Sequence, residues 1–167
     1  ANAALGAVTA TGTVEVADLQ RREVIQEPPL LYDLTALQKE ANSKLDFSAD
    51  KTLTLAQSLY EKKVLSYPRT GSRYISEDVF DEIPSRIMLL RQYPRFTATA
   101  SVLPDAPLNR RPVDDAKVTD HHALLITENL PEGLSQDEQA IYEMVAARLA
   151  RATRKPYPSV RLSGMAN

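Results

Sequence analysis

The stretch SQDEQAIYEMVAARLARAT, residues 135–153, decides the character of this chain because it is its longest uninterrupted helical pattern. Ser135 followed by Glu138 is the pattern of a capping box, in which each side chain accepts a hydrogen bond from the other residue's backbone N–H. The apolar residues recur at helical spacing and form one stripe, made of Ile141, Met144, Val145 and Leu149. We therefore predict a helix over residues 135–153 that packs one face against a core.

Three further helices are predicted from caps and apolar spacing, near residues 35–46, 51–63 and 77–91. The first is expected to begin at Thr35 and the second at Asp50 or Ser48, since these residue types cap helices well. Pro84 should kink or restart the third helix, because proline cannot donate its backbone hydrogen bond. Residues 94–120 hold four prolines and few apolar repeats, so they are predicted to be mostly loop.

The two ends of the chain read differently from its middle. Residues 13–24 alternate well enough for a strand, and residues 156–162 predict an edge strand. Pro28 and Pro29 mark a boundary between the first strand and the helices. The predicted fold class is mainly α: a helical domain flanked by short β-strands that belong to a β-rich neighbour.

Composition excludes several classes of site. The 167 residues are 43% hydrophobic and 25% charged, and the absence of cysteine rules out thiol catalysis, disulfides and thiolate zinc sites. No apolar run approaches the roughly 18 residues of a membrane span, no signal peptide is evident, and a cytoplasmic location is expected. The net charge of −2 is unusual for a DNA-binding domain that works alone. However, residues 62–73 and 148–161 contain several Lys and Arg and no Asp or Glu, so positive charge is concentrated locally despite the negative net charge.

The stretch LSYPRTGSRYIS, residues 65–76, carries the candidate chemistry. Pro68 disfavours helix at Tyr67, and in an extended segment Tyr67 and Arg69 should point to the same side. A guanidinium binds phosphate bidentately, so a phenol beside it suggests attack of the tyrosine oxygen on a phosphodiester. Further candidates for contact with DNA are the side chains of Thr70, Ser72 and Arg73.

The stretch TDHHALLIT, residues 119–127, holds the only two histidines of the chain, His121 and His122. Neighbouring side chains point in different directions in helices and strands, so the pair is a poor metal site and none is expected here. One of the two is a candidate donor to a phosphate oxygen or carrier of a proton.

Together these stretches resemble the type IA DNA topoisomerases, and among them the topoisomerase III branch. The resemblance rests on three blocks in order, EPPLLYDLTALQKEAN, SADKTLTLAQSLYEKKVLSYPRTGSRYIS and DHHALLIT. It implies that Tyr67 is the nucleophile, that Arg69 binds phosphate, and that His121 lies near the scissile phosphate, with His122 a candidate DNA contact. Such enzymes are ATP-independent isomerases that cut one DNA strand, keep its 5′ end as a phosphotyrosine, pass another strand through the gap and reseal it.

The resemblance also implies that part of the machinery is elsewhere. The family's Mg²⁺ site lies in a Toprim domain, and no stretch of this chain resembles that domain. Residues 1–27 and 155–167 then correspond to strands of an arch domain, and residues 28–154 to the helical domain that carries the tyrosine. The expected partners are single-stranded DNA and the Toprim and arch domains of the same enzyme, with no membrane. The fragment alone is expected to be inactive, and Gly71 stands where many relatives have an acid.

Two other classes that form phosphotyrosine are less compatible with the sequence. A tyrosine recombinase needs several arginines and a His-x-x-Arg box before its tyrosine, and that box is absent. A relaxase needs metal-binding histidines separated by a hydrophobic residue, whereas these two are adjacent. A noncatalytic helical module that binds DNA or protein, with Tyr67 in a structural role, is the alternative from a different class.

Overall fold

The structure is a computed structural model that describes residues 16–94, 96 and 107–166. The chain divides into two compact units, one made of Ala1–Glu27 with Pro156–Asn167, the other of Pro28–Lys155. The sequence predicted changes of domain after residues 27 and 154. Each unit is described separately below.

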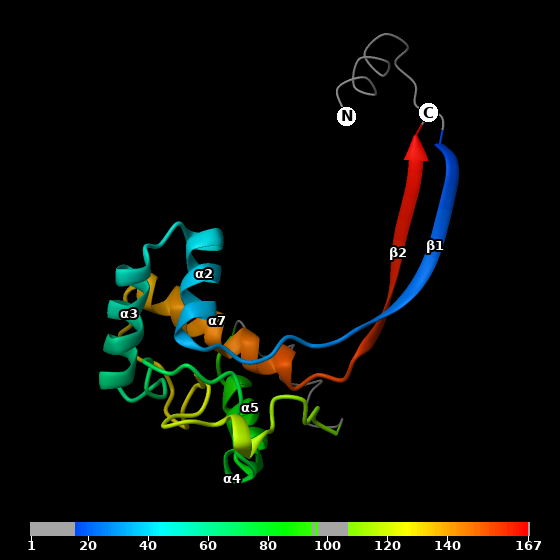
Figure 1. Cartoon of the computed structure of the whole chain (residues 1–167). Coiled ribbons are helices and arrows are strands. Elements are labelled where there is room, and N and C mark those ends of the chain that lie inside the picture. Colours follow the sequence, from blue (N-terminus) through cyan, green and yellow to red (C-terminus); the bar gives the residue numbers. More distant parts are fainter. Residues whose placement is uncertain (1–15, 95, 97–106, 167) are drawn as a thin grey trace. The chain divides into compact units, whose positions relative to one another are not determined.

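The first unit is a two-stranded antiparallel ribbon (Figure 1). Its strands are β1 (Val16–Gln26) and β2 (Tyr157–Ala166). The last residue of β1, Gln26, pairs with the first residue of β2, Tyr157. Both predicted strands are present, each continuing a few residues past its predicted end. Residues 13–15 of the first prediction lie outside the described residues.

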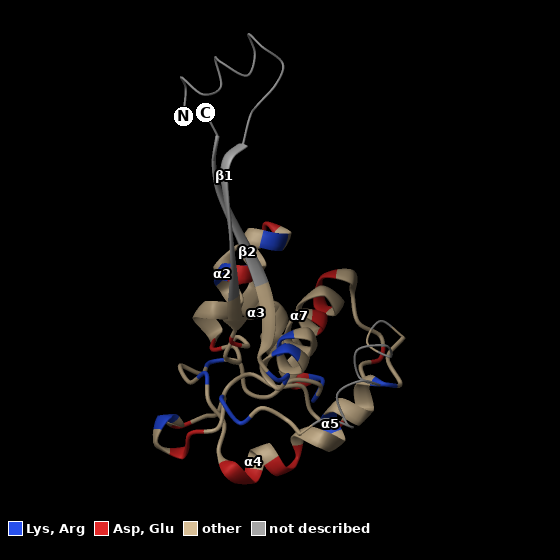
Figure 2. Cartoon of the chain, turned by 90° about the vertical axis from the view of Figure 1, so that its right-hand side faces the viewer, with Lys and Arg blue, Asp and Glu red and all other residues tan. Residues whose placement is uncertain are grey.

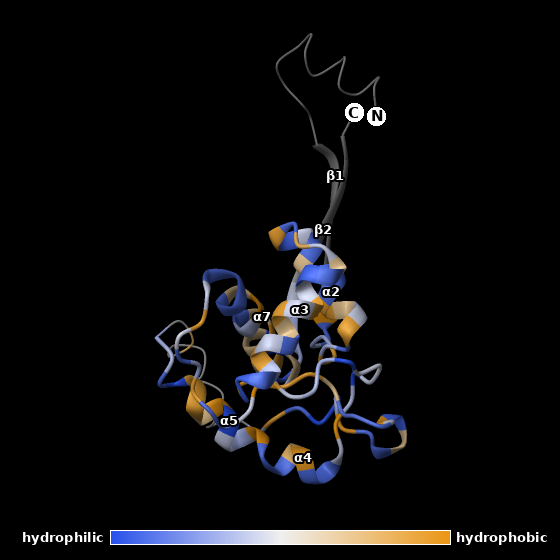
Figure 3. Cartoon of the chain, turned by 90° about the vertical axis from the view of Figure 1, so that its left-hand side faces the viewer, coloured by the Kyte–Doolittle hydropathy of each residue, from blue (hydrophilic) through white to orange (hydrophobic). Residues whose placement is uncertain are grey.

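The second unit is helical, and the predicted mainly α class is confirmed. Its elements are α2 (Leu34–Leu45), α3 (Ala49–Glu61), α4 (Glu77–Asp81), α5 (Ile83–Leu90), the short 3-10 helix η1 (Asp115–Lys117) and α7 (Gln136–Ala152). Within this unit α2, α3 and α7 lie together, and extended segments run between them and α4 (Figures 1 and 3). Figure 3 shows hydrophobic residues in these extended segments as well as on the helices, so the core is built from both.

Local capping explains where the helices begin. The carboxylate of Asp33 accepts a hydrogen bond from the N–H of Ala36 at 2.6 Å, so the cap of α2 is Asp33, two residues before the predicted Thr35. Ser48, one of the two predicted caps, begins α3. The predicted third helix is two helices, α4 and α5, and Pro84 lies in the first turn of the second, where its missing N–H costs nothing.

The long helix α7 forms as predicted, with the capping box complete. Ser135 accepts from the N–H of Glu138 at 3.3 Å, and Glu138 accepts from the N–H of Ser135 at 2.8 Å. Glu138 is also bound by α3 and the residue after it: the Ser58 hydroxyl donates at 2.6 Å and the Lys62 ammonium lies at 2.7 Å. One carboxylate therefore caps α7 and joins it to the end of α3.

Backbone carbonyls at the start of this unit are fixed by side chains from distant positions. Three arginines donate to them: Arg111 to Pro28, Arg148 to Leu30 and Arg73 to Leu31. Hydrogen bonds from charged donors are stronger than those between neutral groups. The segment that precedes α2 is thus held by α7 and by two loops at once.

We predict that Glu138 makes stability depend on pH. Hydrogen bonds from Lys62, Ser58 and the Ser135 N–H lower the pKa of Glu138 to about 2, from 4.5. A carboxylate with a lowered folded-state pKa stabilises the fold above its unfolded pKa, and that contribution is lost as the pH falls from about 4.5 towards 2. Replacing Glu138 by Gln should lower the free energy of unfolding by about 1–2 kcal/mol at neutral pH.

Urea unfolding of wild type and of Glu138→Gln at neutral and acid pH tests this, with exposed Glu132→Gln as the matched control. The gap between wild type and Glu138→Gln should narrow in acid, because protonation removes the same charge from the wild-type residue. A gap of constant size at both pH values would contradict the assignment.

Candidate active site

The segment that carries Tyr67 is held by backbone pairing with a distant part of the chain. Leu65 forms an antiparallel bridge with Ile126. The Ser66 N–H donates to the Leu125 carbonyl at 2.9 Å, and the Leu125 N–H donates to the Ser66 hydroxyl at 3.0 Å. Tyr67 is the next residue, so the position of its backbone is set by these hydrogen bonds.

The ring of Tyr67 lies between two other rings and is half-buried. Tyr60, in the last turn of α3, meets it edge-on, with centroids 5.4 Å apart and planes at 76°. His121 lies tilted against it, with centroids 4.5 Å apart. The ring of His122 makes a different contact: its Nδ1 lies 2.7 Å from the carbonyl oxygen of Ala123.

Exposure changes sharply along the next residues. Pro68 is buried, and Arg69 is exposed two residues after Tyr67. Gly71 is also exposed, and no heavy atom lies within 4 Å of where a Cβ would stand. A side chain would therefore fit at position 71, and the glycine is not required there by packing.

The hydroxyls of Thr70 and Ser72 are turned inward. Thr70 donates to the backbone carbonyl of His121 at 3.0 Å and accepts from the Ser72 N–H at 3.1 Å. The Ser72 hydroxyl donates to the Lys117 carbonyl at 2.9 Å. Both residues are buried, at 5% and 3% exposed, so their hydroxyls stabilise the loop and tie it to His121.

Arg73 is partly exposed and also makes a hydrogen bond inside the fold. Its Nε donates to the Leu31 carbonyl at 3.1 Å, while the residue as a whole stays partly exposed. The exposed acidic residues of α4 lie just beyond it in sequence: Glu77, Asp78 and Asp81, red in Figure 2. Of these three carboxylates, Glu77 is paired with Arg110.

Two other tyrosines are unsuited to attack a substrate. Tyr32 and Tyr142 are at most 1% exposed. Burial raises the pKa of Tyr32 and of Tyr142, because the phenolate would lose its hydration. Tyr67, in contrast, is only half-buried.

A metal site does not accompany the tyrosine in the described part of the chain. No group of three or more Asp, Glu, His and Cys side chains comes together there. The described residues therefore do not fit the Mg²⁺ that the resemblance implies.

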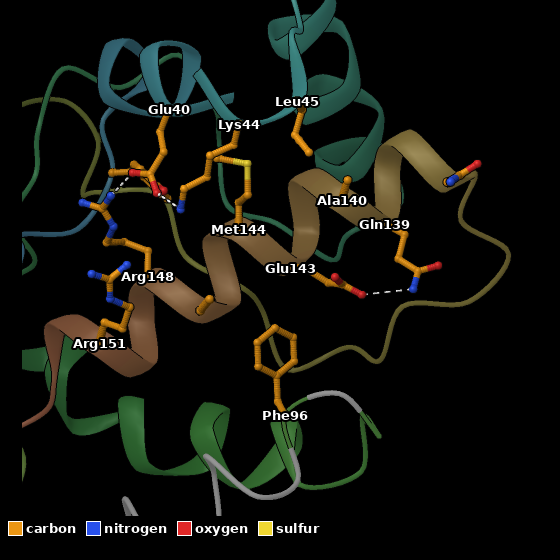
Figure 4. Close-up of a pocket in the computed structure, with 13 residues that line it drawn as sticks. Glu40, Lys44, Leu45, Phe96, Gln139, Ala140, Glu143, Met144, Arg148 and Arg151 are labelled. Carbon is orange, nitrogen blue, oxygen red and sulfur yellow. Dashed lines mark hydrogen bonds and ion pairs between the residues drawn. The ribbon is translucent and has the colours of Figure 1, made fainter. Parts of the chain in front are cut away.

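A cavity of about 590 Å³ between α2 and α7 shares no lining residue with the Tyr67 loop. Figure 4 shows Glu40 between Lys44 and Arg148, with Lys44 at 2.6 Å, and Gln139 donates to Glu143 at 3.0 Å. The cations of Lys44 and Arg148 are therefore already paired with Glu40.

Sequence reasoning did not identify Tyr60 or the bond from Thr70 to His121. The signal for Tyr60 was present: a helix predicted to end near residue 63 and an extended piece just after it must bring the last turn close to Tyr67. The Thr70 bond spans 51 residues of sequence and has no local signal.

Comparison with known proteins identifies the family of the chain. A family model described as DNA topoisomerase matches residues 1–161. A DNA topoisomerase 3 from Bacillus cereus is 41% identical over 138 residues, 80% of this chain and 19% of that protein. A DNA topoisomerase 1 from Alkalihalophilus pseudofirmus is 42% identical over 139 residues, 82% of this chain and 19% of that protein.

Among solved structures, full-length topoisomerase I from Thermotoga maritima matches with a TM-score of 0.59 and 21% identity, over 91% of this chain and 28% of that one. At that identity the match supports the fold alone. The chain spans about a fifth of the length of the curated relatives above, whose shares are both 19%. This chain therefore belongs to the type IA DNA topoisomerase family and is a topoisomerase III-like segment covering part of such an enzyme.

Proposed function

We propose that this chain supplies the nucleophile of a type IA DNA topoisomerase. The oxygen of Tyr67 attacks a phosphodiester of single-stranded DNA, forming a bond to phosphorus as the bond to the 3′ oxygen breaks. The tyrosine gives up its proton and the 3′ oxygen gains one, leaving a 5′-phosphotyrosine and a free 3′ hydroxyl. The reverse attack by that hydroxyl reseals the strand after another strand has passed, so no ATP is needed. The observation that carries this proposal is the accessible Tyr67 ring beside His121, with Arg69 exposed two residues on.

The neighbouring residues divide into two roles in this proposal. Arg69 binds the scissile phosphate with its planar fork, and His121 donates to a phosphate oxygen or carries a proton. Arg73 and His122 contact the strand nearby. Thr70 and Ser72 hold the loop that presents Arg69 and Arg73 to DNA, because their own hydroxyls already donate to backbone carbonyls.

The site is incomplete without the rest of the enzyme. A free tyrosine is almost wholly protonated at neutral pH, so attack needs a proton acceptor and a group that protonates the 3′ oxygen. We place these groups and the Mg²⁺ ion in a Toprim domain outside this chain, and assign the β1–β2 ribbon to an arch domain. The chain alone is then inactive and binds single-stranded DNA weakly. None of the helices in the described ranges has the length and apolar composition of a bilayer span. We place the enzyme in the cytoplasm, with its proposed substrate.

The Tyr67→Phe variant of the intact enzyme tests the proposal. It should bind single-stranded DNA as wild type does and form no covalent adduct, because only the nucleophilic oxygen is lost. End-labelled DNA mixed with enzyme and Mg²⁺, then stopped with detergent, shows the adduct on a denaturing gel. Wild-type enzyme without an adduct would favour the noncatalytic module, and an adduct made by this chain alone would disprove the divided site.

Arg69 should depend on the shape of its cation as well as its charge. Arg69→Ala is expected to slow cleavage on the order of 10²–10³-fold, as loss of a phosphate-binding donor does. Arg69→Lys should recover only part, since an ammonium cannot bind bidentately. Single-turnover adduct formation measures both, and wild-type rates for Arg69→Ala would remove the arginine from the mechanism.

The two histidines should differ in effect. His121→Ala is expected to slow cleavage on the order of 10²-fold, because its ring touches that of Tyr67. His122→Ala should matter less, since His122 lies against the Ala123 carbonyl. Equal losses in the same single-turnover assay would show that the ring contact does not decide the role.

A further inference from the structure

A second cavity, of about 450 Å³, is lined by Tyr60 and by Ser66, the residue before Tyr67. It is lined by residues from the end of α3, the start of the Tyr67 segment and the segment after Ile126: Tyr60, Glu61, Lys63, Leu65, Ser66, Thr127, Glu128 and Asn129. Its volume lies within the range of pockets that hold small ligands. None of the roles proposed above uses it.

The wall of this cavity is built around one backbone carbonyl. The Lys63 carbonyl accepts from the Thr127 hydroxyl at 2.6 Å and from the Asn129 amide at 2.8 Å. Lys63 itself has a φ of 61°, a left-handed conformation that costs free energy in a residue with a side chain. The two hydrogen bonds hold this turn in place, so the cavity is formed before any ligand arrives.

Tyr60 connects the cavity to the nucleophile. It is 40% exposed, lines the cavity and meets the Tyr67 ring edge-on at 5.4 Å. Aromatic side chains that stay exposed next to a DNA-cleaving site are suited to stack on bases, because every base has a flat face. Because the two rings are 5.4 Å apart, the base of a nucleotide whose phosphate is on Tyr67 can reach the Tyr60 ring.

We propose that this cavity, the Tyr60 pocket, holds the base of the nucleotide whose 5′ phosphate is joined to Tyr67. The inference rests on the proposed function. The lining carries two carboxylates, Glu61 and Glu128, and one ammonium, Lys63, so its net charge is −1 and favours a neutral base over a phosphate. The phosphate itself remains on the side of Tyr67 and Arg69.

The pocket gives this base a role in resealing. After cleavage the 5′ end is attached to the protein by one bond, about which the nucleotide can rotate. Stacking on Tyr60 fixes its orientation, so the 3′ hydroxyl meets the phosphorus from a constant direction. Loss of the stack should therefore slow resealing as well as weaken binding of the strand.

The experiment uses the intact enzyme and an oligonucleotide whose cut position has been mapped. A second oligonucleotide carries an abasic residue as the first nucleotide 3′ of the cut. Tyr60→Ala should lower affinity for the normal strand about tenfold, the usual effect of losing one stacked base, and slow resealing when salt is added to the adduct. Tyr60→Phe should keep both near wild type, and exposed Met88→Ala on α5 serves as the control.

The abasic strand separates stacking from packing against Tyr67. Wild type on this strand should behave like Tyr60→Ala on the normal one, and Tyr60→Ala should then cause no further loss. If Tyr60→Ala lowered affinity and slowed resealing equally on both strands, Tyr60 would only position the Tyr67 ring. If Tyr60→Ala had no effect on either strand, the proposed base pocket would also be wrong. If wild type forms no adduct on the normal strand, the proposed function itself fails, which is a different outcome from these two.

Discussion

The backbone of residues 123–127 passes through the interior, and its need for hydrogen bonds is the constraint on which the helical unit depends. Residues 123–126 are at most 1% exposed. A buried N–H or carbonyl without a partner is costly, and here no helix supplies one. The partners come from other segments. The backbone carbonyl of Tyr74 accepts from the Ala123 N–H, and that of Tyr32 accepts from the Leu124 N–H. The Ser66 hydroxyl accepts from the Leu125 N–H. Satisfying one segment therefore brings three distant segments together.

That convergence is what gives the tyrosine a fixed setting. Tyr67 follows the paired Ser66, and His121 precedes the paired Ala123, so both rings emerge from anchored backbone. Thr70 adds a direct bond to the His121 carbonyl. Groups held by packing and by hydrogen bonds of their neighbours keep productive geometry without reorganising, and a reaction that depends on orientation benefits most from this.

The helices could be predicted because their signals are local. A capping box, a proline and an apolar stripe lie within the segments that they describe, and α7 needed nothing more. The error at the start of α2 is also local: Asp33 and Thr35 are both good caps, and only the backbone angles of Asp33 decide between them. The contacts of Tyr67 could be predicted only in part, because Tyr60 follows from a helix end whereas His121 and Thr70 meet through pairing across 51 residues.

Two basic residues show why a count of Lys and Arg overstates the positive charge that this chain leaves unpaired. Arg148 belongs to an acid-free run, yet it donates to the Leu30 carbonyl, pairs with Glu40 and lies 4.0 Å over the Tyr32 ring. Lys62, in the other run, pairs with Glu138. Cations already engaged inside the fold release few counterions on binding, and counterion release supplies most nonspecific affinity. Arg69 is an exposed cation two residues from Tyr67, so under the proposed function most of the affinity for a DNA strand comes from the rest of the enzyme, in keeping with the net charge of −2.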